Sequence, residues 1–351
     1  MGKAFIEIFT DVGFLGAFLQ TIVLIFVGYL FRRKGWIPED GKKTLTAILW
    51  KIGIPCMAFN SFMVDFDKNG LVRSLSVMLI AVVVYAVSIF VSRLFLKRIG
   101  KDRARILSFF VAVGQVTLFA MPILSSVYEG NPEALLYANM LAIPFRIMVY
   151  VFGFFAIAGI KYDRENLRSS VKNIVLNPVM IAMFAGLVIW LTQGILPKVS
   201  VSGGEYAFLR IDKTLPALYK VVKTLSSLVT PLAMFLIGFS LGGTPLKEAF
   251  ADKLAVGLAA AKAFLVPLLT LGIALFLQIT GLAKFDEYAL VSVVVGLGAP
   301  ASATLGVFCV QYEKEELTSA RICTLSALFC LVAVPLSFAI VRYLMTLPLF
   351  A

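Results

Sequence analysis

A stretch of apolar sequence, VVVGLGAPASATLGVF from Val293 to Phe308, contains helix breakers and hydroxyl side chains. Proline lacks an amide hydrogen and clashes with the preceding turn, and Gly298 just before Pro300 weakens a helix further. Unpaired backbone groups are costly in hydrocarbon, so such a break survives only beside protein or a water-filled cavity. We expect a second half-helix to begin at Pro300, which places Ser302 and Thr304 in a first turn whose free amides favour an anion.

A second stretch, VAVGQVTLFAMPIL at residues 111–124, has the same character. We expect Gly114, Gln115 and Thr117 to mark its break and Pro122 to begin its second half. If the two broken helices cross, two half-helix amino termini point at one place in the middle of the membrane. The alternative is a pair of ordinary proline kinks.

Two basic residues lie well inside apolar segments, Arg146 in AIPFRIMVY and Lys262 in AAAKAFLVPLL. Charges at such depth are costly and usually functional, whereas Lys51 and Arg93 lie nearer span ends and are expected to snorkel. We expect no acidic residue at comparable depth, so the buried charge is cationic and favours an organic anion as substrate. For Arg146 the alternative is a structural tie to carbonyl groups at a helix carboxyl end, and Lys262 is the weaker candidate for a substrate contact.

The composition indicates a membrane protein. Of the 351 residues, 60% are hydrophobic and 15% charged, and the mean hydropathy is +0.94, whereas a soluble domain has about 25% charged residues. The net charge of +12 fits basic cytoplasmic loops better than nucleic-acid binding. The chain has no histidine and no CxxC motif, so neither a zinc site nor a disulfide framework is expected. The cysteines are expected to be small packing residues: Cys56, Cys309, Cys323 and Cys330.

Ten apolar segments have roughly the length of a membrane span. They cover residues 13–31, 44–64, 71–96, 104–127, 134–160, 171–195, 218–242, 254–279, 286–311 and 318–346. The joins after odd-numbered spans, with their flanking turns, hold 18 Lys and Arg, against 10 on the opposite side. This bias predicts that both termini lie outside a cell membrane that the chain crosses many times.

Short internal similarities lie five spans apart. PCMAF at 55–59 matches PLAMF at 231–235, and VAVG at 111–114 matches VVVG at 293–296. A repeat of five spans, an odd number, must be inverted in the membrane. Inverted repeats with broken helices at corresponding positions indicate a secondary transporter.

Several of these segments are similar to one known family. They include the run VGYLFRRKGWIPEDGKKTLTAILWKIGIPCMAF, and LNPVMIAMFAGLVI, TPLAMFLIGFSLGG and GAPASATLGVFCVQY, at residues 27–59, 176–189, 230–243 and 298–312. In order and spacing the set resembles the auxin efflux carrier family, bacterial permeases related to the plant auxin exporters. The resemblance extends over nearly the whole chain.

The resemblance implies a fold of ten helices in two inverted five-helix repeats, residues 1–160 and 161–351. Spans 1, 2, 6 and 7 would form a scaffold that dimerises. Spans 3–5 and 8–10 would form a transport domain with crossed, broken spans 4 and 9, as in NhaA and the bile-acid symporters. Members of the family move organic anions, and an elevator-type motion is implied for this chain as well.

The chain departs from the family at three places. Gly114-Gln115 replaces the family's Gly-Asn, and residues 120–122, Ala-Met-Pro, replace its Gly-x-Pro. The plant exporters have a basic residue where this chain has Val310. Gln115 still donates and accepts hydrogen bonds but is longer than Asn, so the substrate need not be that of the relatives.

The sequence therefore predicts a permease for a small mono- or dicarboxylate. Backbone amides and hydroxyls around Ser302 and Thr304, with Gln115 and Thr117, are expected to hold the carboxylate. The other expected site residues have supporting roles: Pro122, Gly298 and Pro300 at the breaks, Arg146 for positive potential, Asn60 along the pathway, and Asn139 and Lys262 as additional contacts.

Two other classes of function were weighed against transport. A membrane receptor on the same fold would bind a carboxylate without moving it. An enzyme would need a nucleophile with a base, paired carboxylates or a metal cluster, and the sequence shows none of these within its spans. No cofactor is expected, and coupling to protons, coupling to sodium and uncoupled transport all fit. The expected partners are the anion, the lipid bilayer and a second copy of the chain, but no nucleic acid.

Overall fold

The computed structural model describes residues 12–128, 131, 133–160, 164–201 and 204–347. Nearly all regular structure among them is helical. The chain is therefore a helical polytopic membrane protein, as the composition predicts. The two termini, whose side of the membrane the charge bias predicts, lie outside the described residues.

Six helical stretches among the described residues are long and apolar enough to cross a membrane. They are built from α2 (Val12–Lys34), α5 (Lys68–Leu96), α8 with η4 and α9 (Glu133–Ile147, Met148–Gly153, Phe154–Ala158), α13 with α14 (Pro216–Ser227, Val229–Gly242), α16 with η5 and α17 (Lys253–Ala260, Ala261–Leu265, Val266–Ile279) and α20 (Glu316–Met345).

The other apolar segments are shorter or interrupted. They comprise α3, η1 and α4 (Glu39–Ile48, Leu49–Gly53, Ile54–Asn60), α6 followed after a gap by η3 and α7 (Lys101–Ala112, Val116–Ala120, Met121–Val127), α11 (Pro178–Thr192), and α18 followed after a gap by α19 (Glu287–Gly298, Ala303–Gln311).

The sixth apolar helix begins at Pro178 rather than at residue 171. The side chain of Asn177 caps α11 by accepting a hydrogen bond from the Val179 amide at 2.9 Å. Asparagine at the cap and proline in the first turn are strong helix-start signals. The preceding residues form a separate amphipathic helix, α10 (Arg164–Val175).

Wide π-helical turns accompany four of the prolines. Three of these turns come directly before a proline near the start of the next helix, and η4 follows Pro144 by one turn. Because proline removes a hydrogen bond and crowds the preceding turn, a wider turn there accommodates it without ending the helix. The three prolines are Pro55 after η1, Pro122 after η3 and Pro267 after η5.

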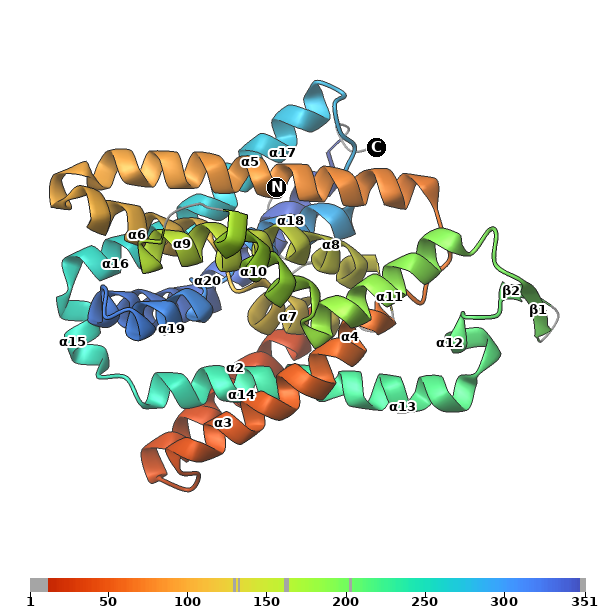
Figure 1. Cartoon of the computed structure of the whole chain (residues 1–351), viewed down its shortest axis with the longest axis horizontal. Coiled ribbons are helices and arrows are strands. Elements are labelled where there is room, and N and C mark those ends of the chain that lie inside the picture. The colour runs from red at the N-terminus through yellow and green to blue at the C-terminus, as the bar shows by residue number, and fades with distance from the viewer. Residues whose placement is uncertain (1–11, 129–130, 132, 161–163, 202–203, 348–351) are drawn as a thin grey trace.

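Helices from the first half of the chain pack against helices from the second half. α2 packs along α14, and α11 packs on α4 (Figure 1). Glycines allow the first contact, because a methyl group on Gly28 would collide with the carbonyl group of Phe235, and one on Gly238 with that of Ile25. Small residues let helix backbones approach closely in a membrane.

The broken helices lie in the middle of the molecule. In Figure 1, α5 crosses the upper part of the view and α2 and α14 the lower part, with α6, α18, α19 and α20 between them. α18 packs against α8, α17 and α20, and α6 packs against α5. This arrangement surrounds both breaks with protein, as the cost of unpaired backbone in hydrocarbon requires.

The join between the sixth and seventh apolar segments contains a small hairpin. Strands β1 (Lys198–Val201) and β2 (Gly204–Ala207) pair antiparallel, with Val199 opposite Tyr206. A short helix, α12 (Ile211–Thr214), follows before α13 begins.

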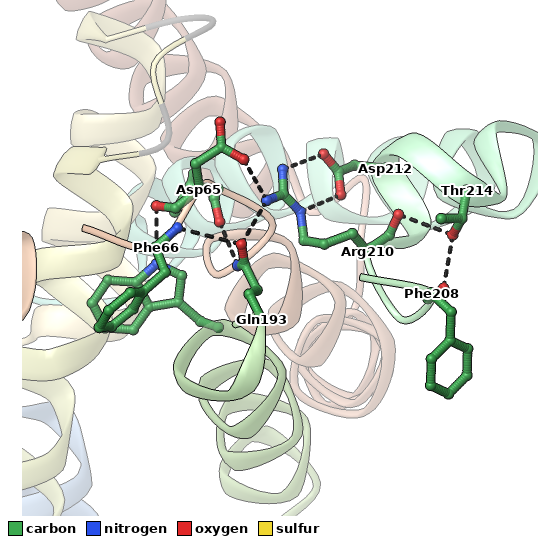
Figure 2. A network of polar contacts seen from close by, with 9 residues as sticks. Asp65, Phe66, Gln193, Phe208, Arg210, Asp212 and Thr214 are labelled. Atoms are coloured by element: carbon green, nitrogen blue, oxygen red, sulfur yellow. Dashed lines mark hydrogen bonds and ion pairs between the residues drawn. The ribbon is translucent and has the colours of Figure 1, made fainter. Parts of the chain in front are cut away.

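Arg210, between β2 and α12, ties distant parts of the chain together (Figure 2). Its guanidinium donates to both carboxylate oxygens of Asp212 at 2.7 and 2.8 Å, to Asp65 at 2.7 Å and to the amide oxygen of Gln193 at 3.0 Å. Gln193 donates in turn to the carbonyl oxygen of Val64 at 2.7 Å. Burial alone would lower the pKa of Arg210, but its bonds to the two carboxylates raise it, so the group stays charged.

Replacing Arg210 by alanine should destabilise the protein more than removing the charge of Asp65. The Asp212 side chain is only 9% exposed and would lose its partner, whereas that of Asp65 is 83% exposed. We expect Arg210→Ala to lower the free energy of unfolding by about 1.5–3 kcal/mol and Asp65→Asn by about 0–1 kcal/mol. Denaturant unfolding of the purified variants measures both, and equal losses would contradict this account of the network.

Candidate functional site

The two helix breaks lie against each other and share hydrogen bonds. The amide of Gln115 donates to the carbonyl oxygen of Pro300 at 2.7 Å, and the amide of Ser302 donates to that of Val113 at 3.1 Å. These bonds form a short antiparallel bridge that pairs Gly114 with Ala301. Each break thus supplies the backbone partners that the other lacks, so neither leaves these groups unpaired in the membrane.

Both second half-helices begin elsewhere than the prolines predict. One begins at Val116, so Pro122 lies well inside it, and the other begins at Ala303, so Pro300 lies in the break itself. The residue before a proline is pushed toward extended backbone, and Ala299 is extended, with ψ at 155°. Pro300 therefore ends the first half-helix of its span. The bridge between the two breaks sets where the second half-helix starts.

Gly114 is the point of closest approach. A Cβ atom there would lie 2.9 Å from the carbonyl oxygen of Gly296, 3.0 Å from that of Ala299 and 3.1 Å from that of Leu297. All three neighbours are backbone atoms, which move less readily than the end of a flexible side chain. The contact between the two breaks, called the crossing from here on, would therefore accept a side chain at position 114 only if these backbone atoms shifted.

Lys262 joins the carboxyl ends of the two first half-helices. Its ammonium group is fully buried and donates to the carbonyl oxygen of Ala112 at 3.0 Å and to that of Leu297 at 2.6 Å. Beside it, the Cys330 thiol donates to the carbonyl oxygen of Gly298 at 3.3 Å. From the sequence, Arg146 could have had a structural role in bonding to carbonyl groups at a helix carboxyl end. In the structure, Lys262 forms bonds of this kind.

A cavity of about 350 Å³ lies directly beside the crossing. One wall comes from α3, η1 and α14, and the other from both breaks, η3, α19 and α20. Its lining is mainly apolar, and the following residues supply its polar side chains: Lys42, Thr46, Gln115, Ser240, Thr304 and Thr324.

Three residues of the predicted site line this cavity: Gln115, Pro300 and Thr304. The side-chain oxygen of Gln115 accepts a hydrogen bond at 3.3 Å from the amide of Ala303, the first residue of α19. Gln115, whose side chain is longer than that of the family's Asn, therefore reaches the amino end of α19. A carboxylate at the Ala303 amide would displace the Gln115 oxygen from it or share the N–H donor with that oxygen.

Three further predicted residues are buried without lining the cavity. Thr117, Ser302 and Arg146 are 2%, 0% and 2% exposed. Their hydroxyl oxygens and both terminal guanidinium nitrogens find no hydrogen-bond partner among the described residues. Buried polar atoms are nearly always paired, so these groups keep hydrogen-bonding capacity that the described residues do not use.

Asn60 and Asn139 lie away from the cavity. The Asn139 amide donates to the Ser61 hydroxyl at 2.8 Å and to the carbonyl oxygen of Leu135 at 2.9 Å. The side-chain oxygens of both asparagines are buried without a partner among the described residues. Ser61 was not foreseen from the sequence, although it is the next residue after Asn60.

Sequence reasoning also missed the parts of the cavity lining that come from α3, η1, α14 and α20. Thr46 and Trp50 lie in a segment expected only to be a span, and Cys323 and Thr324 lie in one with no visible break. The signal that was available is a cluster of small or polar residues on α20, since Ser326 also reaches the crossing and accepts from the Ala301 amide at 3.0 Å.

Paired helix breaks beside a mid-membrane cavity are typical of secondary transporters. Residues 14–338 match the family described as membrane transport protein. The chain belongs to this family, that of the auxin efflux carriers, as the sequence motifs indicated. A comparison with curated proteins finds no match. Members of this family are transporters rather than enzymes.

Gly114→Ala should disrupt the crossing because its methyl group would press on three carbonyl oxygens. Overpacking of this kind costs typically about 1–3 kcal/mol, and thermal unfolding of the purified variant measures it. Gly257→Ala is the matched control, since a methyl group on Gly257 in α16 meets nothing within 4 Å. If Gly114→Ala were as stable as the control, the close approach at the crossing would be refuted.

Proposed function

We propose that this membrane transporter is a secondary permease for a small organic anion, a mono- or dicarboxylate. The observation that carries the proposal is the cavity beside the crossing, which brings Gln115, Thr304 and the first amide of α19 to one place. Carboxylates bind readily at helix amino ends, where free amides and the helix dipole favour negative charge.

The charge around the crossing supports an anion. Arg146 lies in α8, which packs against α18 and η3, and its guanidinium has two buried nitrogens with no partner among the described residues. An unneutralised charge in a low-dielectric interior acts over a longer range than one in water. Arg146 therefore supplies positive potential to the site without touching the cavity.

We also propose that the chain consists of two inverted five-helix repeats, because its two halves pack against each other reciprocally. α2 packs on α14 as α11 packs on α4, and α5 packs against α17, which is the pattern that two inverted five-helix repeats would produce. The paired helices of spans 1, 2, 6 and 7 would form the scaffold. The remaining spans would carry the crossing as the transport domain.

The position of the cavity suggests how access alternates. It reaches Lys42 on α3, within the first join, which the charge bias places on the cytoplasmic side. Away from the cavity, the bond from Asn139 to Ser61 joins the proposed transport domain to the scaffold. An elevator motion of the transport domain would break this bond and carry the crossing to the other side.

A homodimer through the scaffold is part of the proposal. The α2 helix presents a row of exposed apolar side chains, which either lipid or a second copy would cover. The row consists of Leu15, Leu19, Ile22, Val23 and Phe26.

Counterflow in proteoliposomes tests the proposed function. Purified protein is first screened for thermal stabilisation by mono- and dicarboxylates, such as lactate and succinate, and each stabilising anion is then assayed for exchange. Exchange of a stabilising carboxylate supports a permease. Stabilisation without exchange would favour the receptor, and no stabilisation by any carboxylate would contradict the assignment of the anion.

Gln115→Ala should weaken binding of the stabilising carboxylate, because it removes the side-chain NH2 group, which would donate to the carboxylate once the Gln115 oxygen has left the Ala303 amide. We expect a loss of about 1 kcal/mol, which is roughly a fivefold rise in Kd. Gln311→Ala is the matched control, since Gln311 is an exposed residue at the far end of α19. Isothermal titration measures both, and equal Kd values for the two variants would place the site elsewhere.

Arg146→Gln should lower anion affinity more strongly. At an effective dielectric constant of about 20, unit charges about 10 Å apart interact by roughly 1.7 kcal/mol, which is more than about tenfold in Kd. Arg93→Gln removes the same charge from an exposed position on α5 and serves as control. Unchanged affinity in Arg146→Gln, with the fold intact, would remove Arg146 from the site.

A further inference from the structure

We propose that Lys262 is a built-in cation that takes the place of a coupling metal ion, so that transport by this protein requires no sodium. The inference rests on the proposed transport function and adds to it the identity of the positive charge that holds the crossing together. It assigns Lys262 a positioning role in place of a substrate contact.

The first observation is what the ammonium group binds. α6 ends at Ala112 and α18 ends at Gly298, and the Lys262 ammonium donates to carbonyl oxygens in the last turn of both. The carboxyl end of a helix carries partial negative charge and unpaired carbonyl groups. Two such ends that meet at one place repel each other unless a cation lies between them.

The second observation is that no described carboxylate neutralises the Lys262 ammonium group. Lys262 is fully buried, and among the described residues it forms no ion pair with a carboxylate. The two helix ends are therefore its main counterpart, in the way that carbonyl oxygens bind a metal cation in broken-helix transporters.

The third observation is where the lysine is anchored. Lys262 belongs to the π-helical turn η5, directly before Pro267, which itself packs against Gly298 at the end of α18. Its side chain thus reaches the crossing from a helix that packs on α18. A tethered ammonium group stays with the crossing as it moves, whereas a metal ion would have to bind and leave in each cycle.

The wild-type protein gives the first test. Counterflow of the stabilising carboxylate is measured with sodium, potassium or choline as the bulk cation. We expect equal rates in all three. A rate that depends on sodium would overturn this inference and leave the transport function standing, whereas no counterflow in any buffer would count against the proposed function itself.

Two variants give the second test. Lys262→Ala removes the charge and leaves space, and Lys262→Met removes the charge but fills the space. We expect both to be less thermostable than wild type, with lithium, sodium or methylammonium restoring stability and counterflow to Lys262→Ala but not to Lys262→Met. Full activity of Lys262→Met, or equal responses of the two variants to added cations, would overturn the inference.

The thermal readout separates a positioning role from simple packing. A residue that only fills space would be rescued by methionine, which is close to lysine in volume, and would not respond to cations. If Lys262→Ala does not fold, the cation dependence of the wild type decides the matter alone.

Discussion

The structure depends on a pair of hydrogen bonds between two helix breaks that are nearly two hundred residues apart in the chain. Each break leaves amide and carbonyl groups without helical partners, and in a membrane there is no water to replace them. The bonds from Gln115 to Pro300 and from Ser302 to Val113 satisfy these groups reciprocally. Because neither break is stable without the other, the helices that carry them must be placed accurately.

The surrounding residues follow from this constraint. Gly114 allows the breaks to touch, and Lys262 offsets the negative ends of the first half-helices. The amide of Ala301 is paired by Ser326 and that of Ala303 by Gln115. In the predicted site, the hydroxyls of Thr117 and Ser302, the side-chain oxygens of Asn60 and Asn139 and the guanidinium of Arg146 have no partner among the described residues. The guanidinium is the charged group among them, and the proposed anion would complement it.

The sequence predicted the breaks and their pairing but not their details. Gly298 and Pro300 mark a helix end because proline disturbs the residues before it, which is a local effect. The start of the following helix is set by bonds from another segment, and no local pattern showed that Ala303, rather than Pro300, would begin it.

The roles of the buried cations show the same limit. Hydropathy placed Arg146 and Lys262 inside spans, yet only packing shows that Lys262 reaches two helix ends while Arg146 keeps two nitrogens without a partner among the described residues. The split of the sixth segment at Asn177 was readable, since Asn-Pro is a helix start, but the apolar run through it concealed the boundary.

The central claim is that the crossing is the place where an anion binds. A density map of the protein with a stabilising carboxylate bound would test it most directly. The account predicts density for the carboxylate in the cavity, against the amino end of α19, with the Gln115 side chain moved from the Ala303 amide. A carboxylate bound elsewhere, with Gln115 still on that amide, would contradict it.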